Sequence, residues 1–436
     1  MGETDTDAAD QFDARISPEK LDEGTPGLWL RYRRLPRNVF AISLVSLLND
    51  ASSEIIYPLL PVFLSLTLGA SAGVVGLIEG TAESVSSLLK LFAGYFSDRR
   101  GKRKGFVVLG YSLASFARPL LAFATSWYQV FAIRLTDRVG KGLRSAPRDA
   151  MIADTVRVEE RGLAFGFHRA MDHTGAVVGP LIGYLLVMLF AIDRNAPSAA
   201  AFKKVFLLAS IPAFAAMVVV IFFVRESPAR ATAVAVGGGP LPPLSLRGFD
   251  GNFKRFLVIV ALFTLSNSSD AFLLLRAQST GVSIRTIPLL WALLHIVKVG
   301  SSLVGGDLSD RLGRRRLIVS GWILYAAVYA GFAFVNNSIS VWVLFLIYGL
   351  YFGLAEGAEK ALVADLVRPE QRGTAFGLYN LAFGITVLPA SLLMGALWSW
   401  RGPTTAFLVS AVIGTTAALL LMVLVKVRIP APDLPI

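Results

Sequence analysis

Long apolar stretches recur along almost the whole of this chain, and they constrain its fold more than any other feature. Of its 436 residues, 54% are hydrophobic and 17% are charged. A soluble protein of this length would need far more polar surface, whereas a helix of about 20 mostly apolar residues crosses a membrane. We therefore predict an all-α membrane protein with 12 transmembrane helices, at residues 37–66, 73–97, 105–125, 127–150, 162–190, 203–224, 254–279, 282–309, 316–336, 338–364, 373–399 and 403–427.

The two halves of the chain repeat each other. Residues 94–104 and 306–316 share six of eleven positions at an offset of 212. Residues 153–166 and 364–377 share ten of fourteen positions at an offset of 211. Two matches in the same order at nearly the same spacing indicate an internal duplication. We expect two pseudo-symmetric six-helix bundles, at residues 37–224 and 254–427.

The segments outside these bundles differ from them in composition. Residues 1–36 begin with an acidic, polar stretch that lacks the apolar region of a secretory signal. We predict a disordered cytoplasmic tail there. Residues 225–253 contain a run of glycine and proline, which predicts a cytoplasmic linker without regular structure. Residues 428–436 are expected to form a short cytoplasmic tail.

The distribution of basic residues predicts the orientation of the chain. Its net charge is +12, which in a soluble protein would suggest a nucleic-acid partner. Here Lys and Arg gather in short segments between the apolar stretches, such as 99–104 and 311–316. Cytoplasmic loops of membrane proteins carry this excess. We expect a multi-pass protein of the cell (plasma or inner) membrane with both termini in the cytoplasm, and no nucleic-acid partner.

A pattern of glycine, aspartate and arginine recurs in the loops that follow the second and eighth predicted spans. The pattern, G-x-x-x-D-R-x-G followed by basic residues, resembles the signature loop of the major facilitator superfamily, a family of membrane transporters. The resemblance covers residues 37–427 and implies that family's fold of two six-helix bundles. In the family, this loop latches the cytoplasmic side while the central cavity faces outward. The latch residues implied here are Gly94, Asp98, Arg99, Gly101, Gly306, Asp310, Arg311 and Gly313, with Asp154 and Asp365 as candidate partners.

The fifth predicted span carries a second glycine pattern. It resembles the antiporter motif of exporters in the same family, except that Tyr184 stands where the last glycine of that motif would be. The resemblance favours export in exchange for another solute or ion. The alternative is ordinary close packing of small residues around a proline kink. The residues concerned are Gly166, Gly175, Gly179, Pro180 and Gly183.

Charged side chains lie within several predicted spans, and they are the candidates for function. An ionisable residue inside a membrane costs several kcal/mol unless it is paired or hydrated. The fourth span places Arg134, Arg138 and Lys141 on one helical face. Such a face must meet acids or a water-filled cavity. We predict a substrate cavity that involves these three cations together with Asp172, Glu356 and Glu359.

Three further acids are candidates for proton coupling. Asp50 and Glu54 are one helical turn apart in the first span, and Asp270 lies in the seventh. A nearby arginine changes how readily a carboxylate holds a proton. An arginine that moves between two conformations could therefore load and release a proton. The alternative is that these acids are permanent ion-pair partners of the basic fourth span.

These features predict a monomeric secondary transporter of a small organic solute, driven by the proton motive force and without a cofactor. Proton-coupled antiport, and hence efflux, is the first hypothesis. Symport and uptake of an anionic metabolite is the second, because the fourth span is strongly basic. A membrane receptor that transports nothing is a remote third. The chain has no cysteine and only three histidines, which argues against a metal site, and no motif indicates an enzyme.

Overall fold

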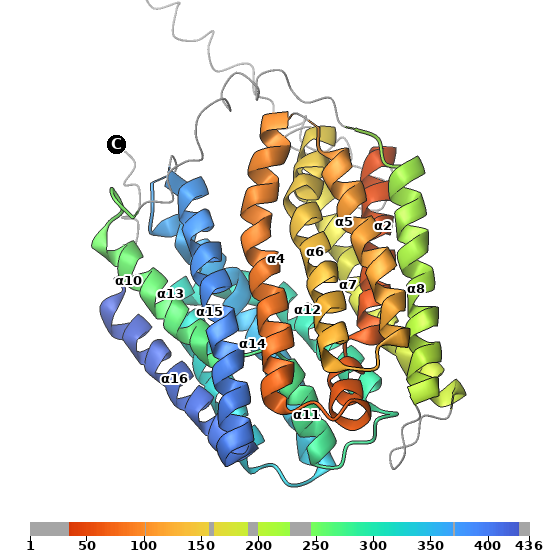
Figure 1. Ribbon diagram of the computed structural model, residues 1–436. Coiled ribbons are helices and arrows are strands. Elements are labelled where there is room, and N and C mark those ends of the chain that lie inside the picture. The colour runs from red at the N-terminus through yellow and green to blue at the C-terminus, as the bar shows by residue number, and fades with distance from the viewer. Residues whose placement is uncertain are drawn as a thin grey trace, which may run out of the picture.

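The described part of the chain is built from helices. The structure, a computed structural model, describes residues 35–100, 102–156, 161–190, 199–226, 246–368 and 371–426, and no strand occurs among them (Figure 1). A chain that crosses a membrane must satisfy its backbone hydrogen bonds internally, and helices do so. The predicted all-α fold is confirmed. The predicted C-terminal tail, nearly all of the N-terminal tail and most of the linker lie outside the described residues.

The first half of the chain forms six spans. Pro58 and Pro61 interrupt the first of them, because proline removes a backbone donor and clashes with the preceding turn. The spans are α2 (Arg37–Ile56) with α3 (Leu60–Val62) and η2 (Phe63–Thr67), then α4 (Ala72–Arg100), α5 (Lys104–Leu120) with η3 (Leu121–Phe123), α6 (Trp127–Thr155), α7 (Arg161–Leu189) and α8 (Ala199–Phe222).

The second half forms six more. Its first span is divided in two by the polar run Asn267–Asp270, so that Asp270 lies at the start of the second piece. The sequence predicted one continuous helix here. The spans are α10 (Gly251–Ser266) with α11 (Ala271–Ser279), then α12 (Ile287–Leu312), α13 (Arg314–Phe334), α14 (Ser338–Asp365), α15 (Arg372–Arg401) and α16 (Pro403–Leu424).

Local sequence determines where several of these helices begin. The Asp250 side chain accepts a hydrogen bond from the backbone N–H of Asn252 and caps α10. Asn337 caps α14 in the same way through the N–H of Ser340, at 2.9 Å. Both are residues that favour the position before a helix. Gly402, with φ +84°, separates α15 from α16 in a conformation that other residues rarely adopt.

Nine of the described spans are long and apolar enough by themselves to cross a membrane. The remaining three are α4, α6 and α12, of which α12 has a shorter apolar stretch at Ile287–Ser302. Both α4 and α6 carry acidic and basic side chains along their middle portions. These helices pack against each other, and Arg134 of α6 forms an ion pair with Glu79 of α4.

The two halves meet along two pairs of helices. α4 runs beside α15, and α7 packs against α12 (Figure 1). Close contact between α4 and α15 depends on glycine: a methyl group added to Gly76 would lie 2.4 Å from the backbone oxygen of Ser391. Gly395 approaches Gly73 on the same seam. The halves therefore touch tightly near the start of α4 and the end of α15.

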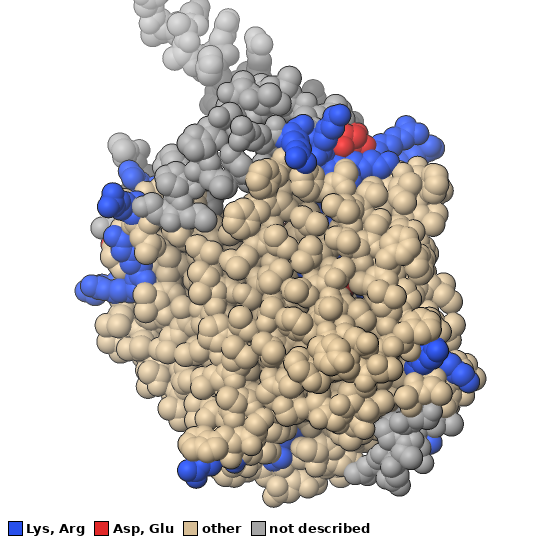
Figure 2. Space-filling view, in the orientation of Figure 1, with Lys and Arg blue, Asp and Glu red and all other residues tan. Residues whose placement is uncertain are grey.

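The outer surface is apolar where a membrane would surround it. In Figure 2, Lys and Arg side chains gather mainly near the upper and lower edges of the face in view, and a broad middle region carries almost no charge. Large apolar side chains are exposed on the outer surface of the protein; Phe222, Val258 and Ile339, for example, are each more than two-thirds exposed. An apolar exterior with ionisable residues turned inward is typical of a membrane protein.

Candidate functional site

A cavity of about 540 Å³ lies between the two halves. Its walls come from α4 and α6 on one side and from α10, α12, α14 and α15 on the other, with Tyr57 and the break before α11 at its floor. This volume is in the usual range for a site that encloses a small organic molecule. Five acids and five bases line it: Glu79, Glu83, Asp270, Glu356 and Glu359, and Lys90, Arg138, Lys141, Lys298 and Lys360.

Contacts between the halves close one end of this cavity. Trp291 Nε1 on α12 donates a hydrogen bond to Glu54 Oε2 on α2 at 2.7 Å. Ser65 Oγ donates to Gln278 Oε1 at 3.1 Å, near the same end. We call this end the closed end. From there the lining extends along α4 to Lys90, along α14 to Lys360 and along α15 to Tyr379.

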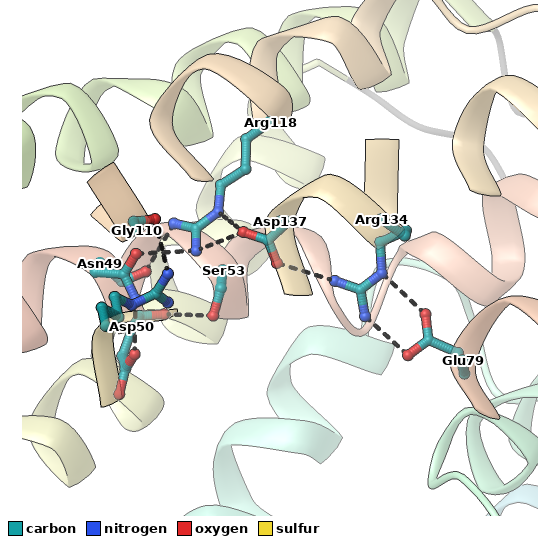
Figure 3. A network of polar contacts seen from close by, with 9 residues as sticks. Asn49, Asp50, Ser53, Glu79, Gly110, Arg118, Arg134 and Asp137 are labelled. Carbon is teal, nitrogen blue, oxygen red and sulfur yellow. Dashed lines mark hydrogen bonds and ion pairs between the residues drawn. The ribbon is translucent and has the colours of Figure 1, made fainter. Parts of the chain in front are cut away.

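A buried chain of ion pairs lies behind the wall formed by α4 and α6 (Figure 3). Arg134 donates to both carboxylate oxygens of Glu79, at 3.0 and 2.8 Å, and lies 3.7 Å from Asp137. Arg118 on α5 binds Asp137 at 3.1 Å and also donates to the backbone and side chain of Asn49. Each charge in this series of ion pairs has a partner of opposite sign, as buried charges require. Arg134 does not line the cavity; Glu79 does.

Two cations of α6 reach the cavity itself. Arg138 and Lys141 both line it, and neither forms an ion pair within 4.0 Å with any residue that the structure describes. The Nε of Arg138 is buried and makes no hydrogen bond within the described chain. Glu83 is the acid of α4 that shares this wall. The wall therefore presents donors that are free to bind an anionic group.

The opposite wall carries an acid surrounded by aromatic rings. The carboxylate of Asp270 accepts a hydrogen bond from the hydroxyl of Tyr348 at 2.7 Å. Tyr348 stacks on Tyr351, with ring centroids 5.8 Å apart. Lys298 Nζ lies 3.7 Å from the centre of the Phe352 ring. Asp270 forms no ion pair within 4.0 Å with any described residue.

Two more acids line the cavity on α14. Glu356 pairs with Lys360 at 3.2 Å, one helical turn along. Glu359 accepts hydrogen bonds from Trp322 Nε1 at 2.8 Å and from the Tyr379 hydroxyl at 2.7 Å. Both donors are neutral, so they orient the carboxylate of Glu359 without cancelling its charge.

The other predicted acids lie outside the cavity lining. Asp50 accepts a hydrogen bond from Asn49 Nδ2 at 3.0 Å. Glu54 lies at the closed end, with Trp291 at 2.7 Å and the Nε2 of His295 at 3.9 Å. Asp172 on α7 is 3.7 Å from His168. The structure thus brings together Arg138, Lys141, Asp270, Glu356 and Glu359 and leaves Arg134, Asp50, Glu54 and Asp172 outside the lining.

The predicted latch is described only in part. Asp154 pairs with Arg103, and Asp365 pairs with Arg314 at 2.5 Å. Both pairs lie within one half of the chain, and their residues are related by the same offset of 211. Gly313 holds φ +87° before α13, and Gly94 lies close to Ala146 on α6. Gly101 lies outside the described residues, as do the side chains of Asp98, Arg99, Asp310 and Arg311 and the surroundings of Gly306.

The glycines of the fifth span pack inside the first half. A methyl group on Gly175 would lie 2.5 Å from the backbone oxygen of Leu47, and one on Gly179 would lie 2.6 Å from that of Ala51. Both contacts are with α2. Gly183 faces Ile55 more loosely, at 3.4 Å. The surroundings of Gly166 are not described. Gly175 and Gly179 therefore allow α7 to lie directly against α2.

Sequence comparisons identify the family. The sequence profile of the Major Facilitator Superfamily matches residues 42–385 and, again, 256–435. The chain belongs to this superfamily. An uncharacterized transporter of the superfamily from Methanocaldococcus jannaschii is 36% identical over 89% of this chain and 95% of that protein. The multidrug resistance protein MdtG of Yersinia enterocolitica is 24% identical over 86% of this chain and 90% of its own length.

Solved structures show the same fold. A bacterial homologue of the human lysosomal transporter Spinster, in an inward-facing and occupied conformation, superposes with a TM-score of 0.72 at 17% identity. The match covers 90% of this chain and 98% of that one. The protein is thus a multi-pass membrane transporter of this superfamily and has the superfamily fold.

Several residues of the site were not among the sequence candidates. Arg118, Glu79 and the tyrosines of α14 are examples. The sequence does show two tyrosines three positions apart in the tenth span, which places both on one helical face. Among the described residues, no group of three or more His, Asp or Glu side chains could hold a metal ion.

Proposed function

We propose that this transporter exports a small organic solute in exchange for protons, and that Asp270 is the carboxylate at which the two alternate. Asp270 lines the cavity, is held by the neutral hydroxyl of Tyr348 and has no cation within ion-pair distance in the described chain. A carboxylate at such depth needs a counter-charge or a proton. The position of Asp270 in the cavity, without a cationic partner among the described residues, is the main support for the proposal.

Competition for one carboxylate produces exchange. When the cavity faces the cytoplasm, a solute with a cationic group displaces the proton from Asp270. When the cavity faces outward, a proton displaces the solute. Because the empty, charged carboxylate is costly inside the membrane, the loaded forms change conformation more readily than the unloaded form. The proton motive force then drives the solute out, and no cofactor is needed.

The conformational cycle rests on rocking of the two halves. We place the basic loops and both termini in the cytoplasm of a plasma-membrane protein, because short cytoplasmic loops carry the excess of Lys and Arg. The closed end is then the outer end, and the described conformation faces inward. Glu54 contributes to coupling in this scheme, because its hydrogen bond with Trp291 joins the halves at the outer end. The latch residues and Asp50 stay candidates for interactions that form when the cavity faces outward.

The similarity to MdtG supports export, since that relative is named a multidrug resistance protein. The second candidate is symport, in which a proton and an anionic metabolite enter together. Arg138 and Lys141, which pair with no residue that the structure describes, favour it, because they provide an anion site in the same cavity. We propose that the transporter works as a monomer in either case, since the cavity is formed within one chain.

The sign of a pH change separates the two candidates. Purified protein is reconstituted into vesicles that contain the pH-sensitive dye pyranine. A cell-extract fraction of small molecules, below about 1 kDa, is added outside without a pH gradient. Antiport makes the vesicle interior more alkaline, because incoming solute exchanges for outgoing protons. Symport makes the interior more acidic. The same extract is also prepared with an isotope label, so that entry of solutes can be followed directly. Entry of labelled solutes without any pH change would contradict proton coupling of either kind.

A further inference from the structure

We propose that the solute is zwitterionic, with an anionic group bound by Arg138 and Lys141 and a cationic group bound by Asp270 among the tyrosines of α14. This inference rests on the proposed transport through the central cavity and specifies the class of molecule that the cavity accepts. It depends on the separation of charge between the two walls, which neither the fold nor the relatives define.

The wall of the first half carries excess positive charge. Three bases and two acids of this half line the cavity, and one of the acids, Glu79, is already held by Arg134. Glu83 alone remains to balance Lys90, Arg138 and Lys141. The buried Nε of Arg138 makes no hydrogen bond within the described chain. A carboxylate or phosphate group of a ligand would supply the missing acceptor.

The wall of the second half carries excess negative charge. Three acids and two bases of this half line the cavity, and Glu356 pairs with Lys360. Asp270 and Glu359 remain against one base, Lys298, which lies over the ring of Phe352. A ligand ammonium group beside Asp270 would complete an ion pair.

Aromatic faces surround the proposed cation site. Tyr348 holds Asp270 by its hydroxyl, and Tyr351, Phe352 and Tyr57 line the same cavity. Aromatic rings attract cations through their electron-rich faces and also pack against apolar groups. The cavity thus suits a molecule whose two charged ends are joined by an apolar or aromatic middle.

A ligand with a single charge fits this arrangement poorly. An anion bound to Arg138 would leave Asp270 without a partner, and a cation bound to Asp270 would leave Arg138 without one. Unpaired buried charges are strongly unfavourable, whereas a zwitterion satisfies both walls at once. The lining thus carries charges of both signs on separate walls, and a ligand with two opposite, separated charges matches it best.

The inference is tested by binding to the purified full-length protein in detergent. The probes are ω-aminoalkanoates of four, six and eight carbons, each compared by calorimetry with the n-alkylamine and the n-alkanoate of the same length. We expect at least one aminoalkanoate to bind about tenfold or more tightly than both single-charge analogues, since each extra ion pair contributes at that scale. Three lengths are needed because the charge separation of the probe must match the distance between the walls.

Two variants show which wall of the cavity binds each charged group of the aminoalkanoate. Asp270→Asn should weaken binding of the aminoalkanoate to the level of the alkanoate and leave the alkanoate unchanged. Arg138→Gln should weaken it to the level of the alkylamine and leave the alkylamine unchanged. Lys141→Gln serves the same purpose should Arg138→Gln not fold. Lys254→Gln removes an exposed cation at the start of α10, and as the matched control it should change nothing.

Three results would overturn the inference. These are equal binding of a single-charge analogue, equal effects of each variant on all probes, and no binding of any aminoalkanoate to folded protein. Binding is measured at equilibrium without a gradient, so these results leave the pyranine experiment untouched. Loss of proton exchange with intact zwitterion binding would refute the proposed function alone.

Discussion

Arg134 on α6 and Glu79 on α4 form a bidentate ion pair, with nitrogen–oxygen distances of 3.0 and 2.8 Å and side chains that are each only 6% exposed. The pair joins the two charged helices that form one wall of the cavity. It removes Arg134 from the group of cations that face a solute. It also fixes the position of the helix from which Arg138 and Lys141 extend.

Removing one partner of this pair should destabilise the protein. Arg134→Ala leaves Glu79 buried without its counter-charge, and we expect the free energy of unfolding to fall by about 3–5 kcal/mol. Unfolding in detergent, followed by circular dichroism, measures the change. The double variant Arg134→Met with Glu79→Leu should recover most of the loss, because neither charge remains. Unchanged stability with lost transport would instead assign Arg134 to the solute.

Gly179 should be essential for packing. An added methyl group would lie 2.6 Å from the backbone oxygen of Ala51, so Gly179→Ala must push α7 away from α2. We expect a loss of about 1–3 kcal/mol. Gly300→Ala on α12 is the matched control, because no atom lies within 4 Å of its added methyl group. The helix should accept that change or gain slightly from it. Full stability of Gly179→Ala would favour the exporter-motif interpretation over packing.

Gly76 should control whether the closed end of the cavity can open. Gly76→Val places a side chain against Ser391, whose backbone oxygen would lie 2.4 Å from the added β-carbon. We expect the population to shift toward the outward-facing state. The chain has no cysteine, so Ser269→Cys at the cavity floor can be labelled alone. Labelling from outside by an impermeant thiol reagent should become faster in Gly76→Val.

The control for that experiment is Gly73→Ala on the same helix, where the nearest atom would lie 3.6 Å away. Its labelling rate should match that of the parent. A Gly76→Val protein that folds and is labelled no faster would show that this seam does not close the cavity.

The ion pair of Arg314 with Asp365 should affect the rate of transport more than stability. Both side chains are partly exposed, at 28% and 38%, and such pairs contribute about 1 kcal/mol or less. Asp365→Asn should therefore unfold almost normally, while the exchange rate changes because the basic loop is released from α14. A fall in stability comparable with that of Arg134→Ala would show that the pair is structural instead.

Much of the fold follows from local sequence. Apolar stretches located the twelve spans, although charged side chains interrupt the apolar character of α4, α6 and α12. The division of the seventh span was missed. Residues 266–270 form a short polar run between apolar residues, and hydropathy averages over so short a run. That break places Asp270 in the cavity.

The pairing of charges could not be predicted from spacing alone. Arg134, Arg138 and Lys141 share a face of α6, yet Arg134 meets Glu79 of α4 whereas the other two reach the cavity. The difference depends on which neighbouring helix covers each turn of α6. Sequence reasoning identified the charged helices, but the contacts between helices decide which charges stay available for a solute.

Proton exchange at Asp270 is the central claim, and pyranine-loaded vesicles test it most directly. With the small-molecule extract outside, the parent protein and Lys254→Gln should both make the vesicle interior alkaline. Asp270→Asn should abolish the signal, and Tyr348→Phe should reduce it, because it removes only the hydrogen bond at 2.7 Å that holds the carboxylate. Folded Asp270→Asn protein that still exchanges protons for solute at the parental rate would contradict the account.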